Sequence, residues 1–79
     1  MNFKIEYYAQ LRDEAACSRE TVVSTAETPA ELFAELNMRH NFSLEQGQVK
    51  VAINDSFADW GCKLTDNDLI VFMPPMAGG

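Results

Sequence analysis

The stretch from residue 28 to residue 36, TPAELFAEL, contains the clearest helix start in the chain. Thr28 is a favoured N-cap residue, Pro29 suits the first helical position, and Glu31 is placed to close a capping box. Apolar residues then recur at helical spacing, namely Leu32, Phe33 and Leu36. A helix with one apolar stripe buries it against another element, and we expect this helix to end near Asn41.

His40 lies at the predicted end of this helix. A positive charge, or a hydrogen bond to the last free carbonyl groups, is favoured at a helix C-terminus. No Ser, Cys or Asp accompanies it at a spacing that suggests catalysis. We therefore interpret His40 as a helix-terminal residue rather than a catalytic one.

The segment before the helix predicts two strands. Residues 2–9 alternate, with Phe3, Ile5 and Tyr7 on one side and Lys4, Glu6 and Tyr8 on the other. Residues 10–18 predict a turn or one short helical segment, and β character returns at residues 20–23. The two strands are therefore expected to form a hairpin.

The segment after the helix predicts three further strands. In residues 49–54 the large apolar residues Val49, Val51 and Ile53 alternate with Lys50, Ala52 and Asn54, which predicts a strand. The Asn-Asp pair at residues 54–55 supplies turn chemistry. Residues 57–60 can form a short edge strand. A polar turn at residues 64–68 leads into residues 69–73, LIVFM, which form a nearly unbroken apolar run.

The predicted order of elements is therefore ββαβββ. One helix lying across a mixed sheet of four or five strands buries both apolar surfaces, and this is the α+β architecture called β-grasp or ubiquitin-like. The apolar run of the last strand predicts a central position, with the helix on one face and the second face open to a partner. We expect one domain over residues 1–79, with residues 74–79 as an extended tail.

Composition limits the classes of partner. The chain has 79 residues, 47% of them hydrophobic, and a formal net charge of -6. This charge opposes nucleic acids and anionic membranes, so we expect neither as a partner, and it suits a protein with a basic groove. The sequence contains no signal-peptide pattern and no stretch that could span a bilayer, so we expect a cytoplasmic protein.

Metal and thiol chemistry are not indicated. Cys17 and Cys62 lie far apart, form no C-x-x-C pair, and have only His40 as a possible third ligand, so we interpret them as free thiols. Four acidic residues after the helix predict a solvated face rather than a metal site: Asp55, Asp59, Asp66 and Asp68. We expect no metal and no permanently bound cofactor.

The sequence ends with Gly78 and Gly79 behind a diproline, Pro74-Pro75. A carboxylate on a residue without Cβ can be threaded through a channel too narrow for a side chain, which favours a working tail. A frayed chain end is the alternative, because glycine is common at disordered termini.

Four motifs occur together in order: YYAQLR at residues 7–12, VAIN at 51–54, LTDNDL at 64–69 and FMPPMAGG at 72–79. Together they resemble the small sulfur-carrier subunit of molybdopterin synthase, the MoaD-type proteins, over nearly the whole chain. The diproline followed by a diglycine is the most specific motif. Asn67 stands where that family often has glycine, but asparagine also tolerates the left-handed conformation.

The resemblance implies that Gly79 carries sulfur and supplies no general acid or base. In the family, an E1-like adenylating enzyme uses ATP to convert the terminal carboxylate into an acyl-adenylate. A persulfide sulfur donor then displaces AMP, which leads to a thiocarboxylate. This sulfur goes to cyclic pyranopterin monophosphate and becomes part of the molybdopterin dithiolene. The resemblance thus implies a non-catalytic subunit with no autonomous activity.

The resemblance also implies two groups of binding residues. The tail that enters the partners consists of Pro74, Pro75, Met76, Ala77 and Gly78. The interface with the large subunit of molybdopterin synthase consists of Tyr8, Phe57 and Met73, for which ordinary core packing is the alternative. The family assembles as a heterotetramer, with two small subunits on a dimer of large subunits.

Other functions remain open. The sulfur carrier of thiamine biosynthesis shares the fold and the terminal diglycine, although the diproline and the longer chain argue against it. A ubiquitin-like modifier would form an isopeptide bond to a target lysine, and a passive binding module would not need its tail. An autonomous enzyme is disfavoured, because the sequence shows no nucleophile with a base, no phosphate loop and no metal cluster.

Overall fold

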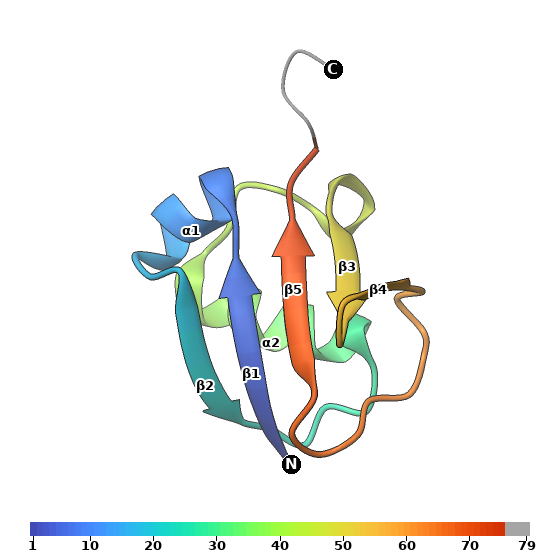
Figure 1. The fold of residues 1–79 in the computed structure, drawn as a ribbon. Coiled ribbons are helices and arrows are strands. Elements are labelled where there is room, and N and C mark those ends of the chain that lie inside the picture. Colours follow the sequence, from blue (N-terminus) through green and yellow to red (C-terminus); the bar gives the residue numbers. More distant parts are fainter. Residues whose placement is uncertain (76–79) are drawn as a thin grey trace.

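A computed structural model describes residues 1–75 of the chain. Within this range the elements are β1 (Asn2–Tyr7), α1 (Ala9–Ala15), β2 (Arg19–Val23), α2 (Pro29–His40), the 3-10 helix η1 (Gln46–Gln48), β3 (Lys50–Ile53), β4 (Ser56–Ala58) and β5 (Leu69–Met73). The five strands form one mixed sheet in the order β2-β1-β5-β3-β4, and α2 lies across one of its faces (Figure 1). The predicted β-grasp arrangement is present.

β5 lies at the centre of the sheet, as the apolar run of residues 69–73 predicts. It pairs in parallel with β1, where Ile5 is opposite Ile70, and antiparallel with β3, where Ala52 is opposite Val71. β1 and β2 pair antiparallel, which confirms their expected pairing, and α1 connects them. β5 is therefore the middle strand of the five, with two strands on each side of it.

α2 begins at the predicted cap, with one difference in its hydrogen bonds. The Thr28 hydroxyl accepts a hydrogen bond of 3.2 Å from the N–H of Glu31. The Glu31 carboxylate accepts from the N–H of Glu27 at 2.8 Å, one residue before the N-cap, so the capping box does not close on Thr28 itself. The helix ends at His40, and Asn41 follows in the left-handed conformation with φ of 57°.

The core lies between α2 and the sheet. The inward residues of β1 and the apolar stripe of α2 are all buried: Phe3, Ile5, Tyr7, Leu32, Phe33 and Leu36. Trp60 packs on this core, with its ring centroid 5.9 Å from that of Phe72. The edge strand expected over residues 57–60 is therefore shifted, because β4 covers Ser56–Ala58 and Trp60 turns back toward the interior.

Left-handed residues lie at the turns of this fold. Asn54 and Asp55 have φ of 51° and 73° between β3 and β4, as their turn chemistry predicts. Asn67 has φ of 68° in the turn before β5, which confirms that asparagine fits this position. Ala9 and Ala16, with φ of 51° and 60°, lie at the two ends of α1. A Cβ in this conformation costs roughly 1–2 kcal/mol, so the alanines carry local strain.

Asp68 is buried, and its assignment to a solvated acidic face was wrong. Its carboxylate accepts hydrogen bonds from the N–H and hydroxyl of Thr65, both at 2.8 Å, and from the Asn54 side chain at 2.9 Å. Burial alone would raise the pKa of Asp68, but these bonds outweigh it and lower the pKa. The Asn54 amide oxygen also accepts from the N–H of Leu69, so the network ties the β3–β4 turn to the start of β5. The other three acidic residues are exposed, as expected: Asp55, Asp59 and Asp66.

Candidate partner-binding site

A hollow of about 240 Å³ lies on the face of the sheet opposite α2, which we call the open face. It is lined by Glu6, Tyr8, Ala52, Asp55, Phe57, Val71 and Met73. The three residues predicted for a partner interface, Tyr8, Phe57 and Met73, are all among them. The structure thus brings together side chains from three distant parts of the sequence, and their role in binding stays a prediction.

The alternation of side chains along each strand explains why these residues share one face. Phe72 is fully buried in the core, so its neighbours Val71 and Met73 point to the other side of β5. In the same way Tyr7 is buried, whereas Tyr8 is 49% exposed. A shift of one residue in register would exchange the two faces, so core packing fixes the composition of the hollow.

The hollow has an apolar floor with exposed aromatic residues beside it. Val71 and Ala52 are paired across β5 and β3 and are only 7% and 9% exposed. Phe57, on the edge strand β4, is 74% exposed. Exposed aromatic side chains next to an apolar floor are typical of protein-binding surfaces, because covering them removes apolar area from water. The hollow is therefore suited to an apolar side chain of another protein.

Charged groups surround this apolar centre. The Glu6 carboxylate is paired with Arg19 of β2 at 2.8 Å, and only 15% of its side chain is exposed. Asp55 is exposed and forms no ion pair within residues 1–75. The Lys50 ammonium lies 5.9 Å from the centre of the Phe57 ring, within the range of cation–π attraction. The rim of the hollow thus carries both signs of charge.

The hollow lies where the predicted tail leaves the sheet. Met73 is the last residue of β5 and also lines the hollow. Pro74 and Pro75 follow it directly, the first half-buried and the second exposed. Because proline restricts φ to about −65°, the pair limits the directions that the chain can take from this point. The predictions for Met76, Ala77, Gly78 and Gly79 lie outside the described residues.

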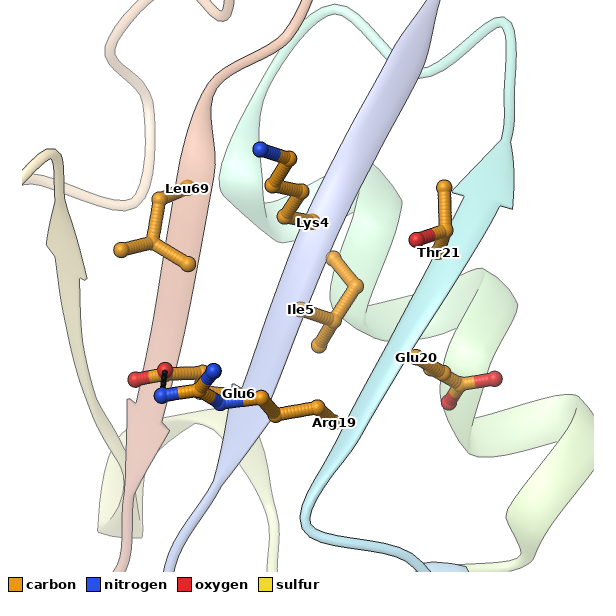
Figure 2. Close-up of a pocket in the computed structure, with 7 residues that line it drawn as sticks. All are labelled: Lys4, Ile5, Glu6, Arg19, Glu20, Thr21 and Leu69. Carbon is orange, nitrogen blue, oxygen red and sulfur yellow. Dashed lines mark ion pairs between the residues drawn. The ribbon is translucent and has the colours of Figure 1, made fainter.

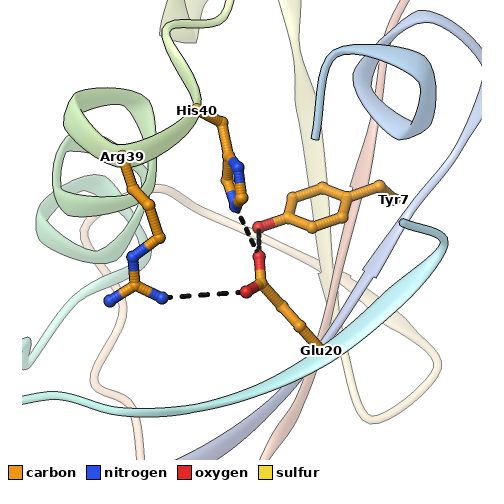
Figure 3. A network of polar contacts seen from close by, with 4 residues as sticks. All are labelled: Tyr7, Glu20, Arg39 and His40. Carbon is orange, nitrogen blue, oxygen red and sulfur yellow. Dashed lines mark hydrogen bonds and ion pairs between the residues drawn. The ribbon is translucent and has the colours of Figure 1, made fainter. Parts of the chain in front are cut away.

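A second polar cluster joins β1, β2 and the end of α2 (Figure 3). The Tyr7 hydroxyl donates a hydrogen bond of 2.5 Å to Oε2 of Glu20, and His40 Nε2 lies 2.7 Å from the same oxygen. Arg39 Nη1 lies 3.7 Å from the other carboxylate oxygen. The helix-terminal position of His40 is confirmed, but its contact is a carboxylate of β2. The feature of the sequence that could have predicted this cluster is the inward position of Tyr7, because a buried phenol needs a hydrogen-bond partner.

The pKa shifts in this cluster indicate a structural role. Burial raises the pKa of Tyr7, and its hydrogen bond to the negative Glu20 raises it further. Burial opposes ionisation of Glu20, but hydrogen bonds from Tyr7 and His40 and the charges of His40 and Arg39 outweigh it and lower its pKa. The pKa values of both groups thus move away from neutral pH. A general acid or base works best with a pKa near the working pH, so neither group is suited to that role.

Other chemistry is limited in the described part of the chain. No three or more His, Cys, Asp or Glu side chains in residues 1–75 are grouped so that they could hold a metal ion. Cys17 and Cys62 are half-buried free thiols, and burial, followed by the charge of Glu20, raises the pKa of Cys17. A raised pKa lowers the thiolate fraction and hence the reactivity of Cys17. No helix within this range is long and apolar enough to cross a membrane.

A capped helix on a five-stranded mixed sheet with its last strand at the centre defines a ubiquitin-like β-grasp protein, with an apolar hollow on its open face. The chain belongs to the ThiS family, whose sequence profile matches residues 5–79. The molybdopterin synthase sulfur carrier subunit of Escherichia coli (strain K12) is 29% identical in an alignment that covers 96% of this chain and 98% of that protein. The resemblance predicted from the motifs is confirmed.

Solved structures confirm the fold. SAMP1 from Haloferax volcanii matches with a TM-score of 0.81 and 19% identity, over 100% of both chains. A chain of the complex of subunits 1 and 2 of molybdopterin-converting factor from Helicobacter pylori 26695 matches with a TM-score of 0.71 and 24% identity, also over 100% of both chains. The family is therefore ThiS, and the fold is that of the ubiquitin-like β-grasp proteins.

Proposed function

We propose that this protein is the sulfur-carrier subunit of a molybdopterin synthase. The observation that carries the proposal is the 29% identity to the Escherichia coli sulfur carrier over 96% of this chain. The geometry supports it, because the hollow lined by Tyr8, Phe57 and Met73 lies where Pro74 continues the chain beyond β5. One partner can therefore cover the hollow and receive the tail.

In this proposal the Gly79 carboxylate is the site of sulfur chemistry. An E1-like enzyme uses ATP to form an acyl-adenylate at Gly79, since a free carboxylate is a poor electrophile. A persulfide sulfur attacks the acyl carbon and displaces AMP, which gives an acyl disulfide. A second thiol then attacks the donor's sulfur, which forms a disulfide there and frees the thiocarboxylate. The thiocarboxylate sulfur then attacks an activated carbon of cyclic pyranopterin monophosphate, and hydrolysis returns the carboxylate.

The rest of the tail serves delivery. Gly78 keeps the tail slim enough to enter two different partners, and Met76 and Ala77 form the segment between it and the prolines. Pro74 and Pro75 reduce the conformational freedom that the tail loses on insertion, which lowers the entropic cost of binding. No residue of this chain is required as a general acid or base.

The proposed binding partner is the large subunit of molybdopterin synthase, in a heterotetramer of two small and two large subunits. The complex of subunits 1 and 2 of the converting factor from Helicobacter pylori supports a pairing of this kind. A ubiquitin-like modifier is the second candidate, since modifier SAMP1 shares the fold with a TM-score of 0.81. The two differ in what becomes of Gly79.

The test is a single-turnover reaction. The full chain with a Gly79 thiocarboxylate is mixed with the large subunit from the same organism and cyclic pyranopterin monophosphate, and molybdopterin is measured. We expect product together with return of the ordinary carboxylate. Chains with an unmodified carboxylate or without Gly79 are the controls and should give none.

The proposal would be contradicted if no molybdopterin formed with a large subunit that is shown to accept sulfur from another carrier. Mass spectrometry of cell extracts then separates the alternatives. Branched peptides with Gly79 joined to a lysine would identify a modifier. A Gly79 thiocarboxylate that fails in this reaction would point to thiamine biosynthesis.

A further inference from the structure

A second hollow, of about 440 Å³, lies beside the first on the open face (Figure 2). It is lined by Lys4, Ile5, Glu6, Arg19, Glu20, Thr21 and Leu69. Because Glu6 lines both hollows, the two are neighbours on one surface. We call them the Tyr8 hollow and the Lys4 hollow.

The side chains that face the Lys4 hollow are mainly polar. Ile5 is buried in the core, and the Glu20 carboxylate bonds Tyr7 and His40 instead. Lys4 is opposite Thr21 on one side and Leu69 on the other in the strand pairing. The hollow therefore offers an ammonium group and a hydroxyl group beside an apolar side chain.

The charge of the open face differs from that of the whole chain. Three basic side chains belong to this face by strand alternation and register, namely Lys4, Arg19 and Lys50. Three acidic residues line its hollows, namely Glu6, Glu20 and Asp55. Basic and acidic groups are thus equal in number on this face, although the chain as a whole has a formal charge of -6. A partner for this face would therefore need groups of both signs of charge.

Lys4 is the cation of this face with the least compensation. Arg19 is paired with Glu6 at 2.8 Å, and the Lys50 ammonium lies 5.9 Å from the Phe57 ring. Lys4 is exposed and has no ion pair among residues 1–75. A partner that covered the Lys4 ammonium without presenting a counter-charge would desolvate it, and this cost would weaken binding.

The distance between Tyr8 and Lys4 is short enough for one partner to cover both residues. Tyr8 and Lys4 are four residues apart along β1 and its continuation, which is about 13 Å at the rise of a strand. A standard interface of about 800 Å² per partner is roughly 28 Å across if it is compact. A partner centred on the Tyr8 hollow with this footprint would therefore reach Lys4.

We infer that the protein seated on the Tyr8 hollow also covers the Lys4 hollow and presents a carboxylate of Asp or Glu to the Lys4 ammonium. The inference rests on the proposed function for the identity of that protein. The Thr21 hydroxyl can donate a second hydrogen bond to the same carboxylate. Apolar contact at the Tyr8 hollow is non-directional, whereas a charge pair at Lys4 fixes how the partner is oriented on the sheet.

The test measures binding of the full chain to the large subunit of molybdopterin synthase from the same organism by calorimetry. Lys4→Glu should weaken binding by about tenfold or more, because it replaces an attraction with a repulsion. Lys63→Glu is the matched control: it changes the net charge equally, and Lys63 is exposed and outside the strands and both hollows. It should change affinity by less than about twofold, within the usual range for rim charges.

Ionic strength gives a second readout. Affinity of the wild-type chain should fall as salt rises, and Lys4→Gln, which removes the charge without repulsion, should reduce that dependence. Lys4→Gln also serves if Lys4→Glu fails to fold. Equal affinities and equal salt dependence for the Lys4 and Lys63 variants would overturn the inference about Lys4. If the wild-type chain still bound the large subunit, the proposed function would stand. Failure of the wild-type chain to bind would overturn both.

Discussion

The hydroxyl of Tyr7 lies 2.5 Å from Oε2 of Glu20, and this contact joins a fully buried ring on β1 to a carboxylate on β2. His40, at the end of α2, bonds the same oxygen at 2.7 Å. One carboxylate oxygen therefore links two strands and the helix that covers them. The consequences for stability can be separated by substitutions that keep the shape of each side chain.

Tyr7→Phe keeps the ring and its packing against Phe72 but removes the hydrogen bond to Glu20. We expect the free energy of unfolding to fall by about 1.5–3 kcal/mol, the range for hydrogen bonds to charged groups. Tyr8→Phe is the matched control, since its ring is half-exposed and it should change stability by less than about 0.5 kcal/mol. Urea unfolding followed by Trp60 fluorescence measures both, and equal midpoints would contradict the role of Tyr7.

Stability should depend on pH at both extremes through the same pair. The pKa of Glu20 is lowered in the folded state, so its contribution is complete above the unfolded value of about 4.3 and is lost as pH falls through the folded value. The pKa of Tyr7 is raised, so its contribution is complete below about 10 and is lost at higher pH.

Glu20→Gln tests the acid side of this dependence. Its stability difference from the wild type should shrink as unfolding is measured at successively lower pH from 7 to 3. Asp68 and Glu14 also have lowered pKa values, so part of the acid dependence should remain in the variant. A difference that stays constant over this range would show that Glu20 has the same pKa in the folded and unfolded states.

Asp68→Ala should destabilise the fold by about 2–4 kcal/mol, because it removes an ionised acceptor and leaves the Thr65 and Asn54 donors without it. The control Asp59→Ala removes an exposed carboxylate and should stay within about 0.5 kcal/mol of the wild type. Thermal unfolding by calorimetry gives the comparison. If both variants lost the same stability, the buried network would not hold the turn before β5.

Ala16→Gly should raise the free energy of unfolding by about 0.5–1 kcal/mol. Ala16 caps α1 with φ of 60°, where glycine has no steric penalty, and the gain is reduced by the greater freedom of glycine in the unfolded chain. Ala34→Gly, an exposed position inside α2, should have the opposite sign and a similar size. A loss of stability in both variants would argue against strain at Ala16.

Phe57→Ala should weaken binding to the large subunit by about 30-fold or more, as expected for an aromatic residue at the centre of an interface. Its 74% exposure predicts little change in stability. Met38→Ala removes an apolar side chain that is 90% exposed on α2 and should leave affinity unchanged. Equal affinities for the two variants would place the interface elsewhere than at the Tyr8 hollow.

The elements with a periodic pattern follow from the sequence, while contacts between distant segments do not. Alternation in β1 and the capped stripe of α2 each depend on a few adjacent residues, so both can be predicted locally. Asp66 and Asp68 look alike in sequence, yet Asp66 is exposed and Asp68 is buried against Asn54. That difference depends on how the β3–β4 turn meets the start of β5.

The candidate site divides in the same way. The family resemblance points to Tyr8, Phe57 and Met73, and the structure places all three at one hollow. The resemblance does not indicate the ion pair of Glu6 with Arg19 or the hollow at Lys4, because both depend on the register between neighbouring strands. The net charge of the chain is also misleading for this face, since it averages over surfaces that a partner never touches.

The central position of β5 has a consequence for synthesis of the chain. β5 is synthesised after the other four strands of the sheet, yet it pairs with β1, where Lys4 is opposite Leu69. A pairing across so much of the sequence closes late, and β1 and β3 have no central neighbour until it does. A chain interrupted before β5 would therefore lack both the open face and the end of β5 from which Pro74 continues. Such an incomplete chain could not compete with the complete protein for its partners.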